Sequence, residues 1–326
     1  MSVLVILEQQ GGEWHKASWE ALAAGAELAR GLGRPVEVAV AGAGIDGLCA
    51  EAAGYKVERV LAVDHALLAE YTPDGFTTAL AQVVRERKPY LVVMPHTYQV
   101  REFAPKLAAS LDRVMVSDVV AARVEGGALI LVRQLFQGKM NADVAVGGEP
   151  PYFVSVQAGA FRADQLEKGS CGAPVEKAQV KLEPGQIRTR PLERFQEAKR
   201  TVDLSSAEII VAVGRGIKDP ENLPMAEKLA QALGGELGAS RPICDNGWLP
   251  MERQIGSSGQ TVSPKLYLAV GISGAIQHLV GMKGSRTVVA INKDANAPIF
   301  EIADYGIVGN LFDVVPALTE EVLKNK

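Results

Sequence analysis

Short apolar runs rich in β-branched residues alternate with longer segments of helical periodicity along this sequence. In the first half, buried strands are predicted at Val3–Leu7, Val36–Val40, Val57–Val63 and Leu91–Met94, and a helix at Ala17–Arg30. Parallel strands need a crossover connection, which is usually a helix. The alternation therefore predicts an α/β fold, with a mostly parallel sheet covered by helices on both faces.

The pattern changes near residue 115. Two apolar runs, Val119–Val124 and Ala128–Leu135, flank a Glu-Gly-Gly turn, which predicts a β-hairpin. Further strands are predicted at Ala142–Val146 and Tyr152–Val156. We therefore expect a first domain over 1–190, in which an α/β sheet carries an antiparallel appendage.

Residues 175–200 are rich in charges, contain Pro184 and Pro191, and have poor periodicity. We interpret them as a linker or solvated connecting segment, or else as a charged face that contacts a partner. The domain limits that follow are a linker at 191–206 and a second domain at 207–326.

The composition excludes several classes of protein. The chain has 326 residues and a net charge of −4, which argues against nucleic acid or an anionic membrane as a partner. It has no run of 18 apolar residues and no basic leader at its start, so neither membrane insertion nor a targeting segment is expected. Cys49, Cys171 and Cys244 form no disulfide framework, which indicates a reducing, cytoplasmic location.

In the second half, each predicted strand ends in glycine or a small polar residue. The strands are expected at 208–213, 266–270 and 287–291, followed by Gly214-Arg215-Gly216, Gly271-Ile272-Ser273-Gly274 and Asn292. Open α/β sheets bind ligands at the carboxyl ends of their strands, and helix N-termini there suit phosphates. We therefore predict a doubly wound, Rossmann- or flavodoxin-like domain with a dinucleotide site at this edge.

Other chemistries find no support in these motifs. Gly214-Arg215-Gly216 lacks the third glycine of the dinucleotide fingerprint, so it is weak by itself. A nucleophile elbow would need glycine at 275, where Ala275 stands. The four histidines are widely spread, so no metal site is expected, and no catalytic nucleophile or base is identified.

Longer stretches of the second half are more specific together than singly. They resemble the signature of the electron-transfer flavoprotein alpha subunit, closely over 208–318 and more loosely over 1–200. The matching stretches are Val213–Gly216, Gly238–Pro242, Pro264–His278, Val289–Asp294, Ala297–Phe300 and Asp304–Val308.

The resemblance implies a C-terminal domain that binds one FAD and an N-terminal domain that docks a beta subunit. It places Arg241 against the flavin ring, Ser258 near flavin N5 and His278 at the N1/O2 edge. The remaining contacts, by side chain or main chain, are implied for Arg215, Ser240, Gln254, Ile255, Gly256, Ser257, Gly271, Ser273, Gly274, Gln277, Asn292 and Asn310.

The physical chemistry agrees with this implied role. One-electron reduction of a flavin places negative charge at N1/O2, and a nearby guanidinium or imidazolium stabilises that charge. We therefore expect Arg241 and His278 to raise the first reduction potential.

Two departures from the family pattern bear on the site. The family often has Gln-Thr-Gly-Lys where this chain has Ser257-Ser258-Gly259-Gln260, so Ser258 lacks the methyl that restricts a threonine rotamer. Gln260 also removes a positive charge. An acidic residue often stands at the position of Asn310, which can bond an adenine or ribose without charge.

The functional hypothesis is an FAD-bound subunit that carries electrons from flavin dehydrogenases, such as acyl-CoA dehydrogenases, to a quinone reductase or another acceptor. Two alternatives stay open. One is the alpha subunit of an electron-bifurcating, NADH-oxidising flavoprotein, and the other is a nucleotide-binding module with no redox role. For the first domain, a self-contained metabolite-binding role is the alternative to docking the beta subunit.

Overall fold

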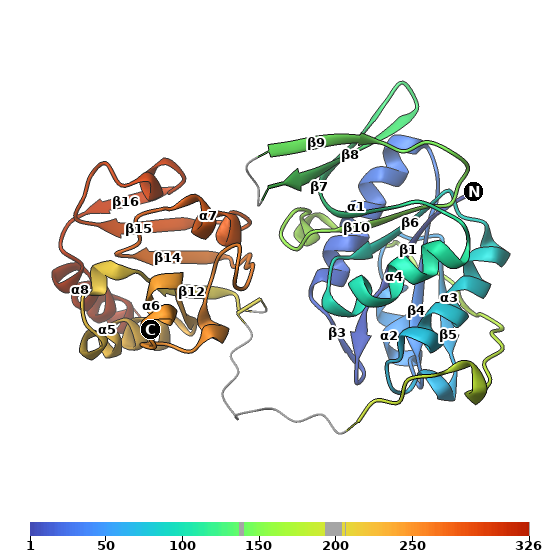
Figure 1. The fold of residues 1–326 in the computed structure, drawn as a ribbon, viewed down its shortest axis with the longest axis horizontal. Helices are drawn as coiled ribbons and strands as arrows, with labels where there is room; N and C mark the ends of the chain where they lie inside the picture. The colour runs from blue at the N-terminus through green and yellow to red at the C-terminus, as the bar shows by residue number, and fades with distance from the viewer. Residues whose placement is uncertain (137–139, 193–203, 206, 326) are drawn as a thin grey trace. The chain divides into compact units, whose positions relative to one another are not determined.

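The structure is a computed structural model, and its contacts divide the chain into two compact units, Met1–Arg194 and Phe195–Lys326. The described residues are 1–136, 140–192, 204–205 and 207–325. The linker expected at 191–206 lies almost wholly outside them, and the domain limits drawn from the sequence stay predictions. Each unit is described by itself (Figure 1).

The N-terminal unit is built on one large sheet with the strand order β11-β5-β4-β1-β6-β10-β7-β8-β9. Neighbouring strands pair in parallel from β11 to β7, and β8 and β9 continue the sheet antiparallel. The α/β sheet with an antiparallel appendage is thereby confirmed. The strands are β1 (Val3–Leu7), β4 (Val36–Gly42), β5 (Arg59–Asp64), β6 (Leu91–Pro95), β7 (Met115–Glu125), β8 (Ala128–Leu135), β9 (Met140–Ala145), β10 (Tyr152–Val156) and β11 (Val175–Lys177), with a small hairpin of β2 (Gln9–Gln10) and β3 (Glu13–Trp14).

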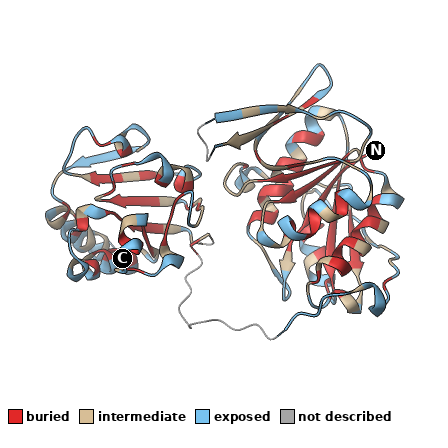
Figure 2. Ribbon diagram, in the orientation of Figure 1, coloured by how far each residue is buried: buried red, intermediate tan, exposed pale blue. Residues whose placement is uncertain are grey.

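Helices cover both faces of this sheet, as the alternation of side chains along β1 shows. Val3, Val5 and Leu7 pack in one core with α1 and α2, whereas Leu4 and Ile6 pack in the other with α3 and α4. Figure 2 shows the buried strands between partly exposed helices. The helices are α1 (Ala17–Leu32), α2 (Asp46–Ala52), α3 (Pro73–Arg87) and α4 (Tyr98–Ser110).

The interpretation of 175–200 as linker or connecting segment is wrong at its start. Val175–Lys177 forms the edge strand β11, which pairs in parallel with β5. A salt-bridge chain holds it there, because Arg59 pairs with both Glu37 of β4 and Glu176 of β11. A three-residue strand with two charged members has no apolar pattern by which the sequence could reveal it.

The C-terminal unit contains a parallel sheet of order β13-β12-β14-β15-β16. In chain order the strands are second, first, third, fourth and fifth, which is the flavodoxin-like doubly wound order. The fold class predicted for this half is confirmed. The elements are β12 (Ile209–Val213), α5 (Leu223–Leu233), β13 (Glu236–Ala239), α6 (Arg241–Asp245), β14 (Leu266–Val270), α7 (Ile276–Met282), β15 (Val288–Asn292), β16 (Tyr305–Val308) and α8 (Leu311–Lys324).

Both faces of this second sheet are also covered. Val211 and Val213 of β12 pack in a core with α5, α6 and α8, whereas Ile210 and Ala212 pack in a core with Ile255 and α7. With its faces closed, the sheet can hold a ligand only at an edge. No helix in the described part of the chain is long and apolar enough to cross a membrane.

Candidate functional site

The strand ends of the C-terminal sheet are joined by main-chain hydrogen bonds. The amide of Gly214, after β12, donates to the carbonyl of Val270 at 2.9 Å. The Gly216 amide donates to Gly271 at 3.0 Å, and the Gly271 amide donates to Ile291 at 2.9 Å. The turns after β12 and β14 and the end of β15 therefore form one continuous main-chain surface.

Glycine is required where these turns meet. A Cβ at Gly214 would lie 2.5 Å from the Gly271 carbonyl oxygen, and one at Gly216 would lie 2.7 Å from the Gly271 Cα. Gly271 itself has φ +64°, in the left-handed region. The side chain of Arg215, between the first two glycines, is exposed at this surface.

Ser240 and Arg241 follow β13 and extend the same edge. The Ser240 amide donates to the Val213 carbonyl at 2.9 Å, and the Ser240 side chain does not cap α6. The Arg241 guanidinium bonds Asp245 at 3.1 Å and is 67% exposed. An exposed pair at this spacing contributes about 0.3–0.5 kcal/mol, so the guanidinium can readily leave it for a stronger anion.

The loop over 254–260 is tied to two other elements. The Ile255 amide donates to Ala239 of β13 at 2.8 Å, and the Ser257 amide donates to Gln277 of α7 at 2.7 Å. Gly256 has φ +145°, and a Cβ there would lie 2.8 Å from the Gln277 carbonyl oxygen. These bonds fix the main chain of Ser257 against that of Gln277, and the side chains of both residues are exposed there.

Gln254 anchors the same loop from inside. Its side chain is 1% exposed, and its Nε2 donates to the Ser258 hydroxyl at 2.9 Å. Its Oε1 is buried and has no hydrogen-bond partner among the described residues. The Ser258 hydroxyl accepts this bond and retains its own proton for donation.

His278 is buried on the inner side of α7. Its Nε2 lies 2.8 Å from the hydroxyl of Tyr267 in β14. Burial lowers the pKa of His278 to about 4, while the backbone of Ile255 acts in the opposite direction. The imidazole is therefore neutral at pH 7, so it can offer a hydrogen bond there but no positive charge.

Two amide side chains of the predicted site are engaged within their own loops. Asn292 donates to the Ile272 carbonyl at 2.8 Å and accepts from the Asp294 amide at 3.0 Å. Asn310 caps α8, where its side chain accepts from the Phe312 amide. Both brace the edge in this structure.

The β14–α7 turn holds the remaining predicted residues. Ser273 is exposed, and its carbonyl accepts from the Ile299 amide at 3.1 Å. A Cβ at Gly274 would lie 2.3 Å from that amide nitrogen. Every residue predicted for the site thus lies at the carboxyl edge of the C-terminal sheet, in the loops packed on it or in the first turn of α7. Tyr267 was missed, although a tyrosine inside an otherwise aliphatic strand was a usable signal.

The same edge of the N-terminal sheet is occupied by pairs of its own side chains. Glu8, at the end of β1, is buried and accepts a hydrogen bond from the Thr97 hydroxyl after β6. His96 Nδ1 lies 2.9 Å from the Ser155 hydroxyl of β10. Burial raises the pKa of Glu8. The polar side chains at the carboxyl ends of β1, β6 and β10 are therefore paired with one another.

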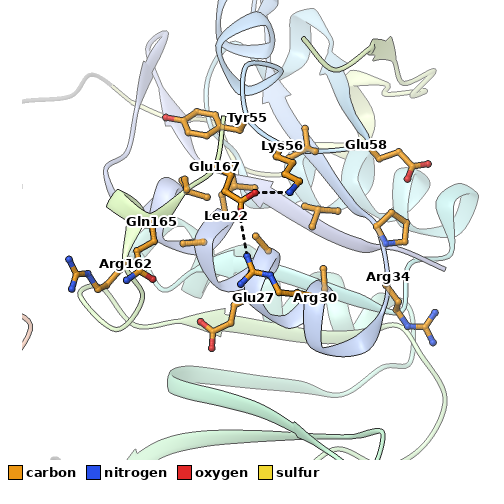
Figure 3. A pocket seen from close by; sticks show the side chains of 17 residues that line it. Leu22, Glu27, Arg30, Arg34, Tyr55, Lys56, Glu58, Arg162, Gln165 and Glu167 are labelled. Carbon is orange, nitrogen blue, oxygen red and sulfur yellow. Dashed lines mark hydrogen bonds and ion pairs between the residues drawn. The ribbon is translucent and has the colours of Figure 1, made fainter. Parts of the chain in front are cut away.

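The N-terminal unit also has a hollow of about 850 Å³ beside α1, shown in Figure 3. It lies at the amino ends of β4 and β5, the edge opposite to the usual ligand side. Two of its cations, Arg30 and Lys56, both pair with Glu167, at 3.5 and 2.6 Å. With Arg34 and Arg162 counted as well, four cations of the lining face three carboxylates, so the hollow offers no concentrated positive field for an anion.

Comparisons with known proteins match both halves of the chain to one family. Residues 203–283 match the family model described as the electron transfer flavoprotein FAD-binding domain. Residues 3–183 match the model described as the electron transfer flavoprotein domain.

Curated relatives agree over the whole length. The electron transfer flavoprotein subunit alpha of Thermoanaerobacterium thermosaccharolyticum is 37% identical and aligned over 99% of this chain and 98% of that protein. The subunit of the same name from Bacillus subtilis is 39% identical, over 98% of this chain and 96% of its own. Protein FixB of Clostridium saccharobutylicum is 38% identical, over 97% and 94%.

Proposed function

The chain belongs to the family of electron transfer flavoprotein alpha subunits, and from this premise we propose that it carries electrons as one half of a heterodimer. Its donors would be flavin dehydrogenases, such as acyl-CoA dehydrogenases, and its acceptor a quinone reductase or another electron acceptor. The observation that carries the proposal is the junction of three strand ends through Gly214, Gly216 and Gly271, beside exposed polar side chains.

The cofactor of the matched C-terminal domain is FAD, and the residues at this edge fit it. The glycine turns let the main chains of the strand ends pack against each other, because a Cβ at Gly214, Gly216 or Gly271 would clash with the neighbouring turn. Arg215 adds a cation suited to a pyrophosphate, and Ser240, Ser273 and Gln277 add hydroxyl and amide groups. We assign these side chains to the phosphate, ribityl and adenosine portions.

FAD, when bound, accepts and releases electrons one at a time. The role of this chain is to stabilise the negative charge that accompanies reduction. We assign that role to Arg241, because its guanidinium is exposed at the edge and its ion-pair partner among the described residues is Asp245. His278 is neutral, so we assign it hydrogen bonding and positioning and not charge compensation.

We assign Ser258 to flavin N5. A hydrogen bond restricts its side-chain rotamer in place of the methyl group that a threonine would have. The hydrogen bond from Gln254 Nε2 to the Ser258 Oγ fixes the rotamer. The hydroxyl proton stays available to the ligand. We therefore propose that serine replaces threonine here without loss of orientation.

Membership of this family implies a beta subunit as the partner. We propose that the N-terminal unit docks it. The paired side chains at the carboxyl edge of the N-terminal sheet, Glu8 with Thr97 and His96 with Ser155, favour a scaffold over a metabolite site. A cytoplasmic location stays a prediction.

The decisive experiment is a cofactor count. The full-length chain is co-expressed with its beta subunit and purified without added flavin, and the visible spectrum and released nucleotides are measured. We expect a yellow complex with about one FAD bound by this chain. A colourless complex that takes up no FAD, or one holding only a non-flavin nucleotide, would refute the proposal.

The same preparation separates the two redox roles. A second FAD in the complex together with NADH oxidation would establish the bifurcating alternative. One FAD per heterodimer and no reaction with NADH would support the simple carrier.

A further inference from the structure

Tyr267 is the second residue of β14, whose other members are aliphatic. The side chain is 0% exposed and lies in the core shared with Ile255 and Met282. Its hydroxyl is 2.8 Å from Nε2 of His278, and the two ring centroids are 6.2 Å apart. A polar group at such a position must find its partner within the protein.

The direction of this hydrogen bond follows from counting protons. Burial raises the pKa of Tyr267 well above its usual value, so the phenol keeps its proton. Nε2 of His278 is the hydrogen-bond partner found for that hydroxyl among the described residues. If Nε2 were protonated, the buried phenol would have no acceptor, which is unfavourable. The phenol therefore donates, and Nε2 accepts.

The single ring proton of the neutral imidazole then belongs on Nδ1. This atom is buried and makes no hydrogen bond of good geometry with the described residues. The backbone of Ile255 nevertheless raises the pKa of His278, which is the direction expected of a carbonyl oxygen near a ring N–H. The Nδ1-protonated ring leaves one buried polar group unpaired, whereas an Nε2-protonated ring would leave two, the phenol proton and the Nδ1 lone pair.

Around this pair, the loop over 254–260 lies directly on α7. A Cβ at Gly281 of α7 would be 2.3 Å from the Gly256 amide nitrogen, so the two backbones are in contact. The Ser257 amide bonds the Gln277 carbonyl next to His278. Tyr267, His278 and Ile255 therefore form a path from the middle of the sheet to the loop that bears Ser257 and Ser258.

We propose that Tyr267 is a positioning residue that holds His278, beside the loop over 254–260, as the neutral, Nδ1-protonated tautomer. The tautomer is a property of this chain by itself. Only its consequence for FAD rests on the proposed function, because the loop carries residues assigned to that cofactor.

Nitrogen NMR of the full-length chain, labelled with ¹⁵N in its four histidine rings, tests the tautomer directly. His278→Gln identifies the resonances of His278. Between pH 6 and 8 we expect Nε2 to appear as an unprotonated, hydrogen-bonded nitrogen and Nδ1 as a protonated one. A protonated Nε2, or a doubly protonated ring, would overturn the proposal.

Tyr267→Phe removes the hydroxyl and keeps the ring. We expect the Nδ1-protonated form to lose its dominance and FAD to bind about threefold to tenfold more weakly, the range expected for one net hydrogen bond. Tyr98→Phe, at a site 89% exposed in the other unit, is the matched control and should change neither quantity. An unaltered tautomer in Tyr267→Phe would refute the positioning role, and the wild-type spectrum still decides if that variant does not fold.

The two hypotheses fail separately. The expected tautomer in a chain that takes up no FAD would support the inference and refute the proposed function. An FAD-loaded chain with a protonated Nε2 would do the reverse.

Discussion

At the carboxyl edge of the C-terminal sheet, Gly214 and Gly271 bring two turns of the main chain into contact, and exposed serine, glutamine and arginine side chains lie beside them. At the same edge of the N-terminal sheet, Glu8 pairs with Thr97 and His96 with Ser155. Both units have parallel strands with helices on both faces. The two edges therefore differ in their side chains and not in their architecture: polar groups pair with each other at the N-terminal edge, and exposed ones remain at the C-terminal edge.

The largest effect is expected from a substitution that disrupts the carboxyl edge of the C-terminal sheet. Gly214→Val would place a Cβ 2.5 Å from the Gly271 carbonyl oxygen and add two methyl groups. We expect it to lower the unfolding free energy of the C-terminal unit by about 3 kcal/mol and to abolish FAD uptake. Hydrogen exchange of each unit and the visible spectrum measure the two effects.

Gly47→Ala is the control for that change, because a Cβ at Gly47 meets nothing within 4 Å and the residue lies inside α2. It should be neutral or stabilising by up to about 1 kcal/mol. Retained FAD in Gly214→Val would show that the glycine junction is not part of the site.

The next effect concerns a buried carboxylate that forms an ion pair within the N-terminal unit. Asp74 of α3 is buried and pairs with Lys106, and it accepts the Arg188 amide at 2.9 Å. Asp74→Asn should lower the stability of this unit by about 2 kcal/mol at pH 7 and leave the flavin unchanged. Urea unfolding followed by hydrogen exchange checks the size, and an altered flavin potential would contradict the separation of roles.

The pH dependence of stability tests the sign of the contribution that Asp74 makes to the free energy of unfolding. The hydrogen bond from Lys106 and that from the Arg188 backbone hold the pKa of Asp74 well below its usual value. Its contribution is therefore present above the unfolded pKa of about 4 and is lost as the pH falls toward the folded value. Wild type should lose stability over that acid range, and Asp74→Asn should show a smaller loss.

Arg241→Ala tests charge offered to a ligand. We expect the first reduction potential of the flavin to fall by tens of millivolts, where about 59 mV corresponds to about 1.4 kcal/mol for one electron. Stability should barely change, since the pair with Asp245 is exposed. Lys228→Ala, which removes a cation from the exposed side of α5, is the control. Equal potentials in both variants would remove Arg241 from its assigned role.

The smallest expected effect is at Glu8. Burial raises its pKa, opposed by the hydrogen bond from Thr97. Its carboxyl therefore contributes most at low pH, and this contribution is lost as the pH rises through the raised pKa. Glu8→Gln keeps the shape and should stabilise the N-terminal unit at pH 7 by less than about 1 kcal/mol. A flatter stability profile between pH 4 and 7 is the result to measure, and a loss of stability at pH 7 would contradict it.

Strongly apolar strands were predictable from the sequence. The predicted first and last residues agree with the structure for Val3–Leu7, Tyr152–Val156 and Leu266–Val270. These runs are buried on both faces, so their composition alone separates them from their surroundings. The edge strand at 175–177 was not predictable, because main-chain pairing with β5 and salt bridges hold it, and not an apolar pattern of its own.

For the candidate site, the glycine and polar turns after the strands were predictable, because strand ends of a parallel sheet must share one edge. The pairing of Arg241 with Asp245 also follows from its spacing of four on a helix. Tyr267 stood out in the sequence as a tyrosine in an aliphatic strand, but its contact with His278 was not predictable, since it joins a strand to a helix through the core.

The loops of the C-terminal edge are fastened through amide and carbonyl groups, such as Ile255 to Ala239 and Ser257 to Gln277. These main-chain hydrogen bonds do not depend on a bound cofactor, so the chain without FAD should keep the binding surface in place. Reloading would then require little ordering of the chain, and the apoprotein should regain its colour without first refolding.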